Sequence, residues 1–361
     1  MFPPAPAPIA PTAPAPLVPP AAAPLRRPAL SVVVPCYNEE ATLPLLHARV
    51  AAAARAAVGD DHEIVLVNDG SRDDSWAAMR RLAAADPRVV AINLSRNHGH
   101  QLALTAGLDL CAGEQILIID ADLQDPPELL ADMRVMMARE GADVVYAVRR
   151  KREGETLFKK ATAAAFYRVL DRVTDTPIPL DTGDFRLMTR RALDALLSLP
   201  EQARFIRGMV AWVGFRQVPF AYDRAERHAG ETNYPLGKMV RLALDAVTGF
   251  STAPLRWASH LSVILAGCSL LLLFYIAFGY FSGERVQGWT STMLVVVVLS
   301  AIQMFVLGMI GEYLGRLYIE AKRRPLYLIA DVAGTPSSRA TLGFQATTSE
   351  ERAGASELGS Y

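Results

Sequence analysis

Two long apolar segments near the C-terminus restrict what this chain can fold into more than any other feature. Residues 261–281 and 289–310 contain no charged side chain. Each has about the 20 residues that a helix needs to cross the hydrocarbon core of a bilayer. In a water-soluble protein they would have to form a buried helical hairpin, which is unusual for two adjacent segments this apolar. We therefore expect two transmembrane helices within residues 259–312.

The charges that flank these segments predict their orientation. Arg256 precedes the first segment, and Arg316 and the basic run 322–324 follow the second. The connection between them, 282–288, holds one arginine and one glutamate. Because positive residues favour the cytoplasmic side, both ends of the hairpin are expected there, together with the large N-terminal domain and both termini.

The two ends of the chain have compositions that do not build a core. Residues 1–28 are rich in proline and alanine, which predicts a disordered tail, with a proline-rich docking arm as the alternative. Residues 331–361 are small and polar and are also expected to be disordered. The net charge is zero, so no nucleic-acid partner is indicated. The three cysteines lack metal-ligand spacing and predict no disulfide framework.

Between these ends, residues 29–235 alternate aliphatic runs with amphipathic helical segments. Five runs are interpreted as strands: "ALSVVVPC", "HEIVLVN", "RVVAINLS", "QILIIDAD" and "ADVVYAVRR". This alternation predicts an α/β fold with a mostly parallel sheet and helices on both faces. In such sheets ligands bind beyond the carboxyl ends of the strands.

Polar residues gather where these runs end, which is the main evidence from the residues for an active site. They are Tyr37, Asn38, Glu39, Asp69, Gly70, Ser71, Arg96, Asn97, Asp120 and Asp122. Asp120 and Asp122 form an Asp-x-Asp triplet at the tip of a strand. Two such carboxylates suit Mg²⁺ or Mn²⁺ that also binds phosphate oxygens, and Gln124 can add a carbonyl oxygen. Pro126 and Pro127 are expected to begin a helix.

Five motifs in one order resemble those of the inverting family-2 glycosyltransferases of the GT-A fold, a Rossmann-like α/β architecture. They are "VVVPCYNEE", "LVNDGSRDDS", "DADLQDPPE", "TGDFRLM" and "RHAGETNYPLGKMVRLALD". The two apolar segments and "GEYLGRLYIEAKRRPLYLI" are similar to the bacterial polyprenyl-phosphate (bactoprenol) subgroup, relatives of dolichyl-phosphate mannosyl- and glucosyltransferases. The resemblance covers residues 29–330 and excludes both tails.

The resemblance implies which residues bind the donor, a nucleotide sugar that is a UDP-sugar in the similar subgroup. The implied nucleotide-sugar ligands are Pro35, Tyr37, Glu39, Val67, Asp69, Asp120, Ala121, Arg227 and Lys238. Asp120, Asp122 and Gln124 would coordinate Mn²⁺ or Mg²⁺ at the diphosphate. A cation and basic side chains there would stabilise the charge that develops on the departing nucleotide.

The implied acceptor is polyprenyl phosphate, and its implied phosphate ligands are Arg149, Lys159 and Lys160. Asp122, Asp184 and Arg149 are the candidate catalytic residues. Asp184 is a candidate base or orienting group, and bracing of its own loop is the equal alternative.

His98 and His100 lie two residues apart, so one helical face does not hold both. We interpret them as loop and helix-start residues near the nucleotide rather than metal ligands.

Together these observations predict transfer of one sugar, with inversion, to polyprenyl phosphate at the bacterial inner membrane. The product would serve cell-envelope or lipopolysaccharide modification. Residues 236–258 are expected to form amphipathic juxtamembrane helices, on the membrane surface or as core helices, and 313–330 a basic cytosolic helix or strand. A homo-oligomer, such as a tetramer, is implied by the resemblance.

Three other functions are weighed against this one. A processive polysaccharide synthase would carry glutamine where Ala253 stands, and a single hairpin is small for a polymer channel. A nucleotidyltransferase would need a glycine-rich loop after the first strand, which "PCYNEE" is not. A non-catalytic lipid-binding or scaffold partner of a flippase would not need an intact Asp120 and Asp122.

Overall fold

The computed structural model describes residues 27–149, 182–223, 253–282 and 288–335. The tail expected at 1–28 lies almost wholly outside these residues, as do the basic loop 150–160 and most of the segment 236–258. Residues 253–258 of that segment are described, and they form the start of a long C-terminal helix rather than a separate juxtamembrane helix.

One eight-stranded sheet forms the centre of the N-terminal domain, with strand order β7-β5-β6-β4-β1-β2-β3-β8. The strands are β1 Leu30–Cys36, β2 His62–Asn68, β3 Val89–Leu94, β4 Gln115–Ile118, β5 Val144–Arg149, β6 Thr182–Thr189, β7 Gln217–Tyr222 and β8 Ile329–Ala333. β1, β2, β3 and β4 are parallel, as predicted, and β7 runs parallel to β5. The sheet is thus mixed but mostly parallel.

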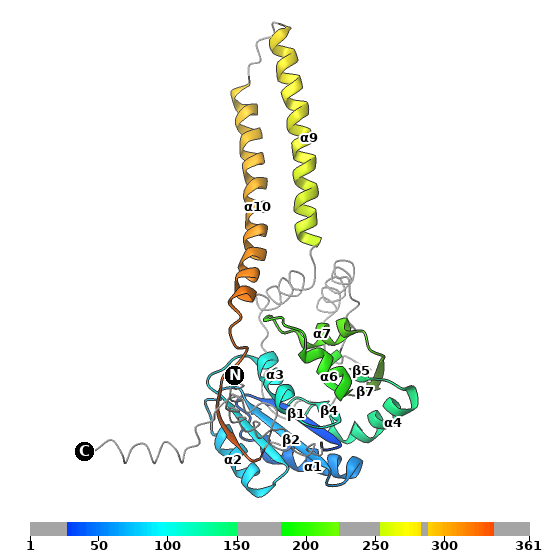
Figure 1. Cartoon of the computed structure of the whole chain (residues 1–361). Coiled ribbons are helices and arrows are strands. Elements are labelled where there is room, and N and C mark those ends of the chain that lie inside the picture. The colour runs from blue at the N-terminus through cyan, green and yellow to red at the C-terminus, as the bar shows by residue number, and fades with distance from the viewer. Residues whose placement is uncertain (1–26, 150–181, 224–252, 283–287, 336–361) are drawn as a thin grey trace, which may run out of the picture.

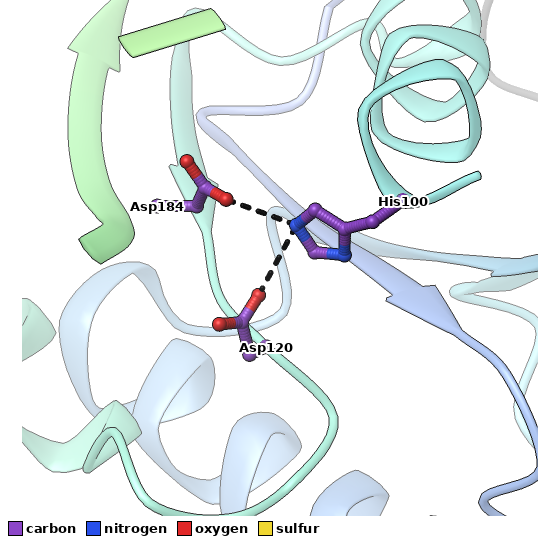
Figure 2. A group of neighbouring side chains, drawn as sticks. All are labelled: His100, Asp120 and Asp184. Atoms are coloured by element: carbon purple, nitrogen blue, oxygen red, sulfur yellow. Dashed lines mark hydrogen bonds and ion pairs between the residues drawn. The ribbon is translucent and has the colours of Figure 1, made fainter. Parts of the chain in front are cut away.

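The fifth predicted strand does not follow the fourth directly in the sheet. Strand β6 lies between β4 and β5 and is antiparallel to both. This strand contains the motif "TGDFRLM", for which the sequence predicted no strand. Its insertion carries Asp184 to the edge of the sheet at which Asp120 lies (Figure 2).

Helices cover both faces of the sheet, as the alternating pattern predicted (Figure 1). One apolar layer packs α1 Leu43–Val58, α2 Ser75–Ala85 and α4 Leu130–Glu140 against the sheet. The opposite layer packs α3 His100–Leu110, α6 Arg190–Leu197 and α7 Ile206–Val213. Strand β1 serves both layers, because Val32 and Val34 face one side while Val33 faces the other.

Two long helices rise from one end of this domain (Figure 1). They are α9 Ala253–Phe281 and α10 Trp289–Lys322, and both predicted apolar segments are helical. Within the described residues, one stretch is long and apolar enough to cross a membrane, Leu294–Lys322 of α10; an 18-residue window of it has a mean hydropathy of 2.5, and none of that window is buried.

The chain returns to the sheet after α10. Strand β8 pairs antiparallel with β3 at the edge of the sheet. The sequence placed residues 331–361 in a disordered tail, and this boundary is wrong for residues 331–333, which belong to β8. These residues form a strand because they pair with β3, a long-range contact that the composition of the whole C-terminal stretch does not reveal.

Candidate active site

The loops that leave the parallel strands are joined to each other at the carboxyl edge of the sheet. The loop after β1 bonds to the loop after β2, because the side-chain oxygen of Asn38 accepts from the backbone N–H of Arg72 at 2.8 Å. The loop after β2 bonds to that after β3, where the Asp69 carboxylate accepts the backbone N–H groups of His98 and Gly99 at 2.7 and 3.0 Å. The structure thus brings together the polar residues that the sequence assigned to this edge.

Asp120 lies two residues beyond β4, and its carboxylate is electrostatically destabilised. Its side chain is 27 % exposed, and its Oδ1 atom is buried with no hydrogen-bond partner among the described residues. Burial raises its pKa to about 6, and the negative charges of Asp184, Asp125 and Asp122 act in the same direction, while His100 opposes them. A buried carboxylate oxygen of this kind favours a cation beside it.

A tight turn follows Asp120 and fixes the second aspartate of the triplet. The backbone N–H of Gln124 donates to Oδ1 of Asp122 at 3.1 Å, and Leu123 between them has a φ of 61°. A leucine in this left-handed region is uncommon, and the side chain of Leu123 is buried. The 3₁₀ turn Pro127–Leu129 then leads into α4, in agreement with the predicted helix start.

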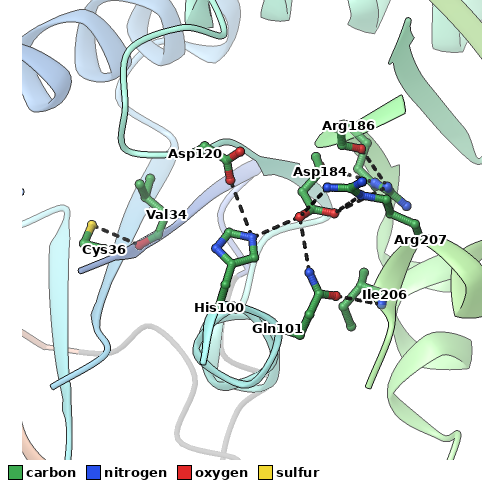
Figure 3. Close-up of polar contacts among 10 residues, drawn as sticks. Val34, Cys36, His100, Gln101, Asp120, Asp184, Arg186, Ile206 and Arg207 are labelled. Carbon is green, nitrogen blue, oxygen red and sulfur yellow. Dashed lines mark hydrogen bonds and ion pairs between the residues drawn. The ribbon is translucent and has the colours of Figure 1, made fainter. Parts of the chain in front are cut away.

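Asp184 is the most tightly held carboxylate of the site (Figure 3). Its side chain is 2 % exposed. It accepts from Nε2 of His100 at 2.9 Å, from Nε of Arg207 at 2.8 Å and from Nε2 of Gln101 at 3.3 Å. Burial alone would raise its pKa, but these donors and the guanidinium of Arg186 hold the pKa far below its ordinary value.

His100 links the two buried carboxylates (Figure 2). Its Nε2 lies 2.9 Å from Asp184 and 3.6 Å from Asp120. Burial lowers the pKa of this imidazole, but the hydrogen bond to Asp184 and the charge of Asp120 outweigh that effect and raise it. Ligand atoms of these three residues lie within 4.8 Å of one another, close enough to share a metal ion.

His100 is the first residue of α3, as predicted. Its place beside Asp120 and Asp184 also puts it in a group whose ligand atoms could hold a metal ion, so the prediction that it is not a metal ligand stays a prediction. The sequence argument compared His98 and His100 on one helix face. The relevant neighbours are Asp120 and Asp184, which lie on other elements.

Comparison with known proteins identifies the family to which this constellation belongs. The family model "Glycosyl transferase family 2" matches residues 31–197. The chain is 47 % identical to the glycosyltransferase YkcC of Bacillus subtilis over 310 residues, which are 86 % of this chain and 95 % of that protein. The chain belongs to glycosyltransferase family 2.

Two further relatives of this family-2 glycosyltransferase have names that state an acceptor. The prophage bactoprenol glucosyl transferase homolog of Escherichia coli is 37 % identical over 84 % of this chain and 99 % of its own length. The bactoprenol glucosyl transferase of Shigella phage SfV is 37 % identical over 83 % of this chain and 97 % of its own length. Glucosyl-3-phosphoglycerate synthase of Mycobacterium tuberculosis, solved with Mn²⁺ and UDP-glucose, matches with a TM-score of 0.41 and 22 % identity over 62 % of this chain and 78 % of its own.

The donor set of this glycosyltransferase fits a hard divalent cation. The buried Oδ1 of Asp120, which accepts no hydrogen bond among the described residues, and the carboxylate of Asp122 are the kind of oxygen ligands that Mg²⁺ and Mn²⁺ take. Of the predicted ligands, Gln124 contacts Asp122 through its backbone N–H. The group of possible ligands around His100 contains Asp120 but neither Asp122 nor Gln124.

Some of the residues predicted for the nucleotide pocket are exposed, and others are buried or already hydrogen-bonded within the protein. Tyr37 is 41 % exposed just beyond β1, so its ring is available to a ligand. Pro35 and Val67 are buried within β1 and β2, and Ala121 is buried beside Asp120. The carboxylate of Asp69 is already bonded to the loop after β3, and burial raises its pKa although these bonds oppose the effect.

Glu39 is likewise engaged within its own loop, because its carboxylate accepts from the Thr42 hydroxyl at 2.7 Å. Arg149 is the last residue of β5. The strand next to β5 is β6, which carries Asp184, so two of the three predicted catalytic residues, Arg149 and Asp184, come from adjacent strands. The predicted phosphate ligands Lys159, Lys160, Arg227 and Lys238 lie outside the described residues.

Proposed function

We propose that the protein transfers a single sugar from a UDP-sugar to polyprenyl phosphate, with inversion at the anomeric carbon. The product is a polyprenyl-phosphate-linked monosaccharide made on the cytoplasmic leaflet. The observation that carries this proposal is the alignment with two bactoprenol glucosyl transferases over 97 % and 99 % of their lengths. The catalytic domain is a GT-A fold in this proposal, which the mixed α/β sheet and the family membership support.

Asp120 and Asp122 hold the divalent cation, Mn²⁺ or Mg²⁺, in this proposal. Such a cation supplies positive charge to the diphosphate of the leaving group when bound. The buried Oδ1 of Asp120 supports this assignment, since it accepts no hydrogen bond among the described residues and its contact with Nε2 of His100, at 3.6 Å, is longer than a hydrogen bond. Arg227 and Lys238 bind the donor diphosphate, and Tyr37 contacts the nucleotide.

The acceptor needs little activation. The second pKa of a phosphomonoester is about 6, so the attacking oxygen is largely ionised at neutral pH. Asp184 therefore acts as an orienting residue rather than a base, an assignment that its ionic contacts with Arg207 and His100 support. Arg149, Lys159 and Lys160 bind the acceptor phosphate in this proposal.

The membrane arrangement completes the proposal. Both α9 and α10 cross the inner membrane of a bacterium, the catalytic domain and both termini face the cytoplasm, and the chain forms a homo-oligomer. The apolar window of α10 supports a membrane crossing, and the basic residues after it support this orientation.

Transfer from a panel of labelled UDP- and GDP-sugars to undecaprenyl phosphate tests the proposal. The full chain is supplied with Mn²⁺ or Mg²⁺, and EDTA serves as a control. Label should enter the lipid from one UDP-sugar and be lost with EDTA. Asp122→Asn should abolish transfer in a folded, inserted protein, whereas Asp132→Asn, on the exposed side of α4, should not. Nucleotide binding without any lipid product would refute the acceptor assignment.

A further inference from the structure

The last turn of α10 touches the catalytic domain at one specific point. Both carboxylate oxygens of Glu320 accept from the backbone N–H of Gln202, at 2.9 and 3.1 Å. Gln202 belongs to the link between α6 and α7. A hydrogen bond to an ionised carboxylate is about twice as strong as one between neutral groups, so this contact ties the link firmly to the helix.

The other end of the same link is bonded to the candidate active site (Figure 3). The backbone N–H of Ile206 donates to Oε1 of Gln101 at 2.9 Å, and the next residue, Arg207, bonds to Asp184. Gln101 also donates to Asp184. A stretch from Gln202 to Arg207 therefore connects α10 directly to the most tightly held carboxylate of the site.

The chain beyond α10 fixes that helix from its other side. The hydroxyl of Tyr327 donates to Asp109 of α3 at 2.7 Å, and the carbonyl of Leu328 accepts from the backbone N–H of Ser95 at 2.8 Å. Strand β8 then pairs with β3. The end of α10 is thus held on both sides and cannot swing freely relative to the catalytic domain.

We propose that Glu320 is a positioning residue, which fixes the link Gln202–Arg207 to α10 and thereby sets the place of Arg207 and Asp184 relative to the bilayer. This inference rests on the proposed function, since only a membrane-embedded acceptor requires a set distance between site and bilayer. The reacting phosphate of a polyprenyl chain sits at the headgroup level, whereas the nucleotide sugar arrives from water. Loss of Glu320 should therefore impair use of the lipid and spare binding of the nucleotide.

The test uses the full chain in lipid nanodiscs with Mn²⁺, UDP-sugar and undecaprenyl phosphate. Glu320→Ala should lower kcat/KM for the lipid by about 10- to 100-fold, a range typical of misplaced reacting groups. The Kd for UDP should change less than about twofold, within the scatter of measured contributions for a group that does not touch the nucleotide. Glu320→Gln keeps an acceptor oxygen for the Gln202 N–H and should restore most of the activity.

A matched control lies on the same helix. Glu312 pairs with Arg316 of α10 itself, so Glu312→Ala removes a carboxylate without touching the link. Its lipid transfer should equal that of the wild type. Hydrogen exchange supplies a second readout, because the amides of the stretch Gln202–Arg207 should exchange faster in Glu320→Ala and at the normal rate in Glu312→Ala.

The outcomes are distinguishable. If Glu320→Ala transferred sugar to the lipid as fast as the wild type, the positioning role would be overturned. A parallel loss of UDP binding and thermal stability would overturn it too, because it would show that Glu320 contributes only to the stability of the fold. Unchanged exchange in the link would overturn the contact itself. If the wild type gave no lipid product, the proposed function would be refuted, and the positioning role with it. The hydrogen-exchange experiment would still decide whether Glu320 holds the link.

Discussion

At the scale of single residues, Asp120 shows how a site can trade stability for function. Its raised pKa, about 6, means that the folded protein holds the ionised form less favourably than the unfolded chain does. The destabilisation is therefore present above that pKa and absent when the group is protonated at low pH. Asp120→Asn removes the charge, so in EDTA at pH 7.5 it should raise the free energy of unfolding by about 1–2 kcal/mol, allowing for partial exposure.

The same substitution should abolish sugar transfer, because an amide is a poor ligand for Mn²⁺ or Mg²⁺ beside a diphosphate. Urea unfolding followed by tryptophan fluorescence, together with the lipid transfer assay, measures both effects. Asp132→Asn on α4 is the control and should change neither. A variant that is less stable in EDTA and retains activity would contradict the assignment of Asp120.

Sequence reasoning located Asp120 and Asp122 because a strand of consecutive aliphatic residues ends just before them. It could not locate the partners of Asp184. His100 lies 84 residues from Asp184 along the chain, and Arg207 reaches it from a helix beyond β6. Such contacts depend on the order of strands in the sheet, which local composition does not specify. Whether Asp184 was a base or a brace accordingly stayed open at that stage.

At the scale of secondary-structure elements, Asp86 joins three of them. Its carboxylate at the end of α2 accepts from the Arg88 side chain just before β3 and contacts His47 of α1. The hydrogen bond from Arg88 is the largest cause that lowers its pKa, to about 2, and burial opposes it. A carboxyl group whose pKa is lower in the folded protein than in the unfolded chain stabilises the fold at any pH above the pKa of the unfolded chain. This stabilisation is lost as the pH falls through the pKa of the folded protein.

Asp86→Asn should therefore cost about 2 kcal/mol of unfolding free energy at pH 7, and the difference from wild type should shrink between about pH 5 and pH 2. Asp60 offers a matched control. It also pairs with Arg88, but its side chain is 81 % exposed, so Asp60→Asn should cost no more than about 0.5 kcal/mol. Denaturant titrations across this pH range test the prediction, and a pH-independent difference for Asp86→Asn would contradict it.

Helix α3 lies against the sheet through a glycine. A Cβ added at Gly107 would overlap Cγ1 of Val33 and come within 3.0 Å of Cγ2 of Val67. Gly107→Ala should cost about 1–3 kcal/mol of stability by overpacking. It should also slow sugar transfer, because the first residues of α3 are His100 and Gln101.

A double-mutant cycle with Val33→Ala checks this explanation. The smaller side chain makes room for the new methyl group, so the double variant should be more stable than the sum of the two single changes predicts. The coupling can be read from urea unfolding and from recovery of transfer. Simple additivity would show that the overlap with Val33 is not the cause.

The alternation of strands and helices was sufficient to predict β1 to β5 and the coverage of both faces. It failed at β6, because Asp184 and Arg186 interrupt the apolar pattern that marks a buried strand. Both are buried all the same, since they neutralise one another inside the fold. A strand that buries an ion pair is thus missed by an argument based on hydrophobicity alone.

At the scale of the whole molecule, the chain after α10 makes the helical hairpin part of the catalytic domain rather than a detached anchor. After the two long helices, the chain returns to the catalytic domain. There β8 pairs with β3, and the hydroxyl of Tyr327 donates a hydrogen bond to Asp109. Composition predicted the two helices but placed residues 331–333 in a tail, because a strand as short as β8 is specified by its pairing partner more than by its own residues.

The proposed topology predicts which residues face each side of the membrane. Ser282 follows α9 directly, and Asp331 is exposed on β8. In cells, with Cys268 replaced by alanine, a cysteine at position 282 should react with a membrane-impermeant maleimide from outside. A cysteine at position 331 should react only after permeabilisation. The buried Cys36 and Cys111 should not react with the maleimide. The Cys268→Ala chain without an added cysteine measures this background. If position 282 reacted only after permeabilisation, α9 would not cross the membrane. A spanning α10 would then place the two ends of the hairpin on opposite sides and separate β8 from β3. The pairing of these two strands forbids that arrangement, so this outcome would refute the proposed two-helix topology.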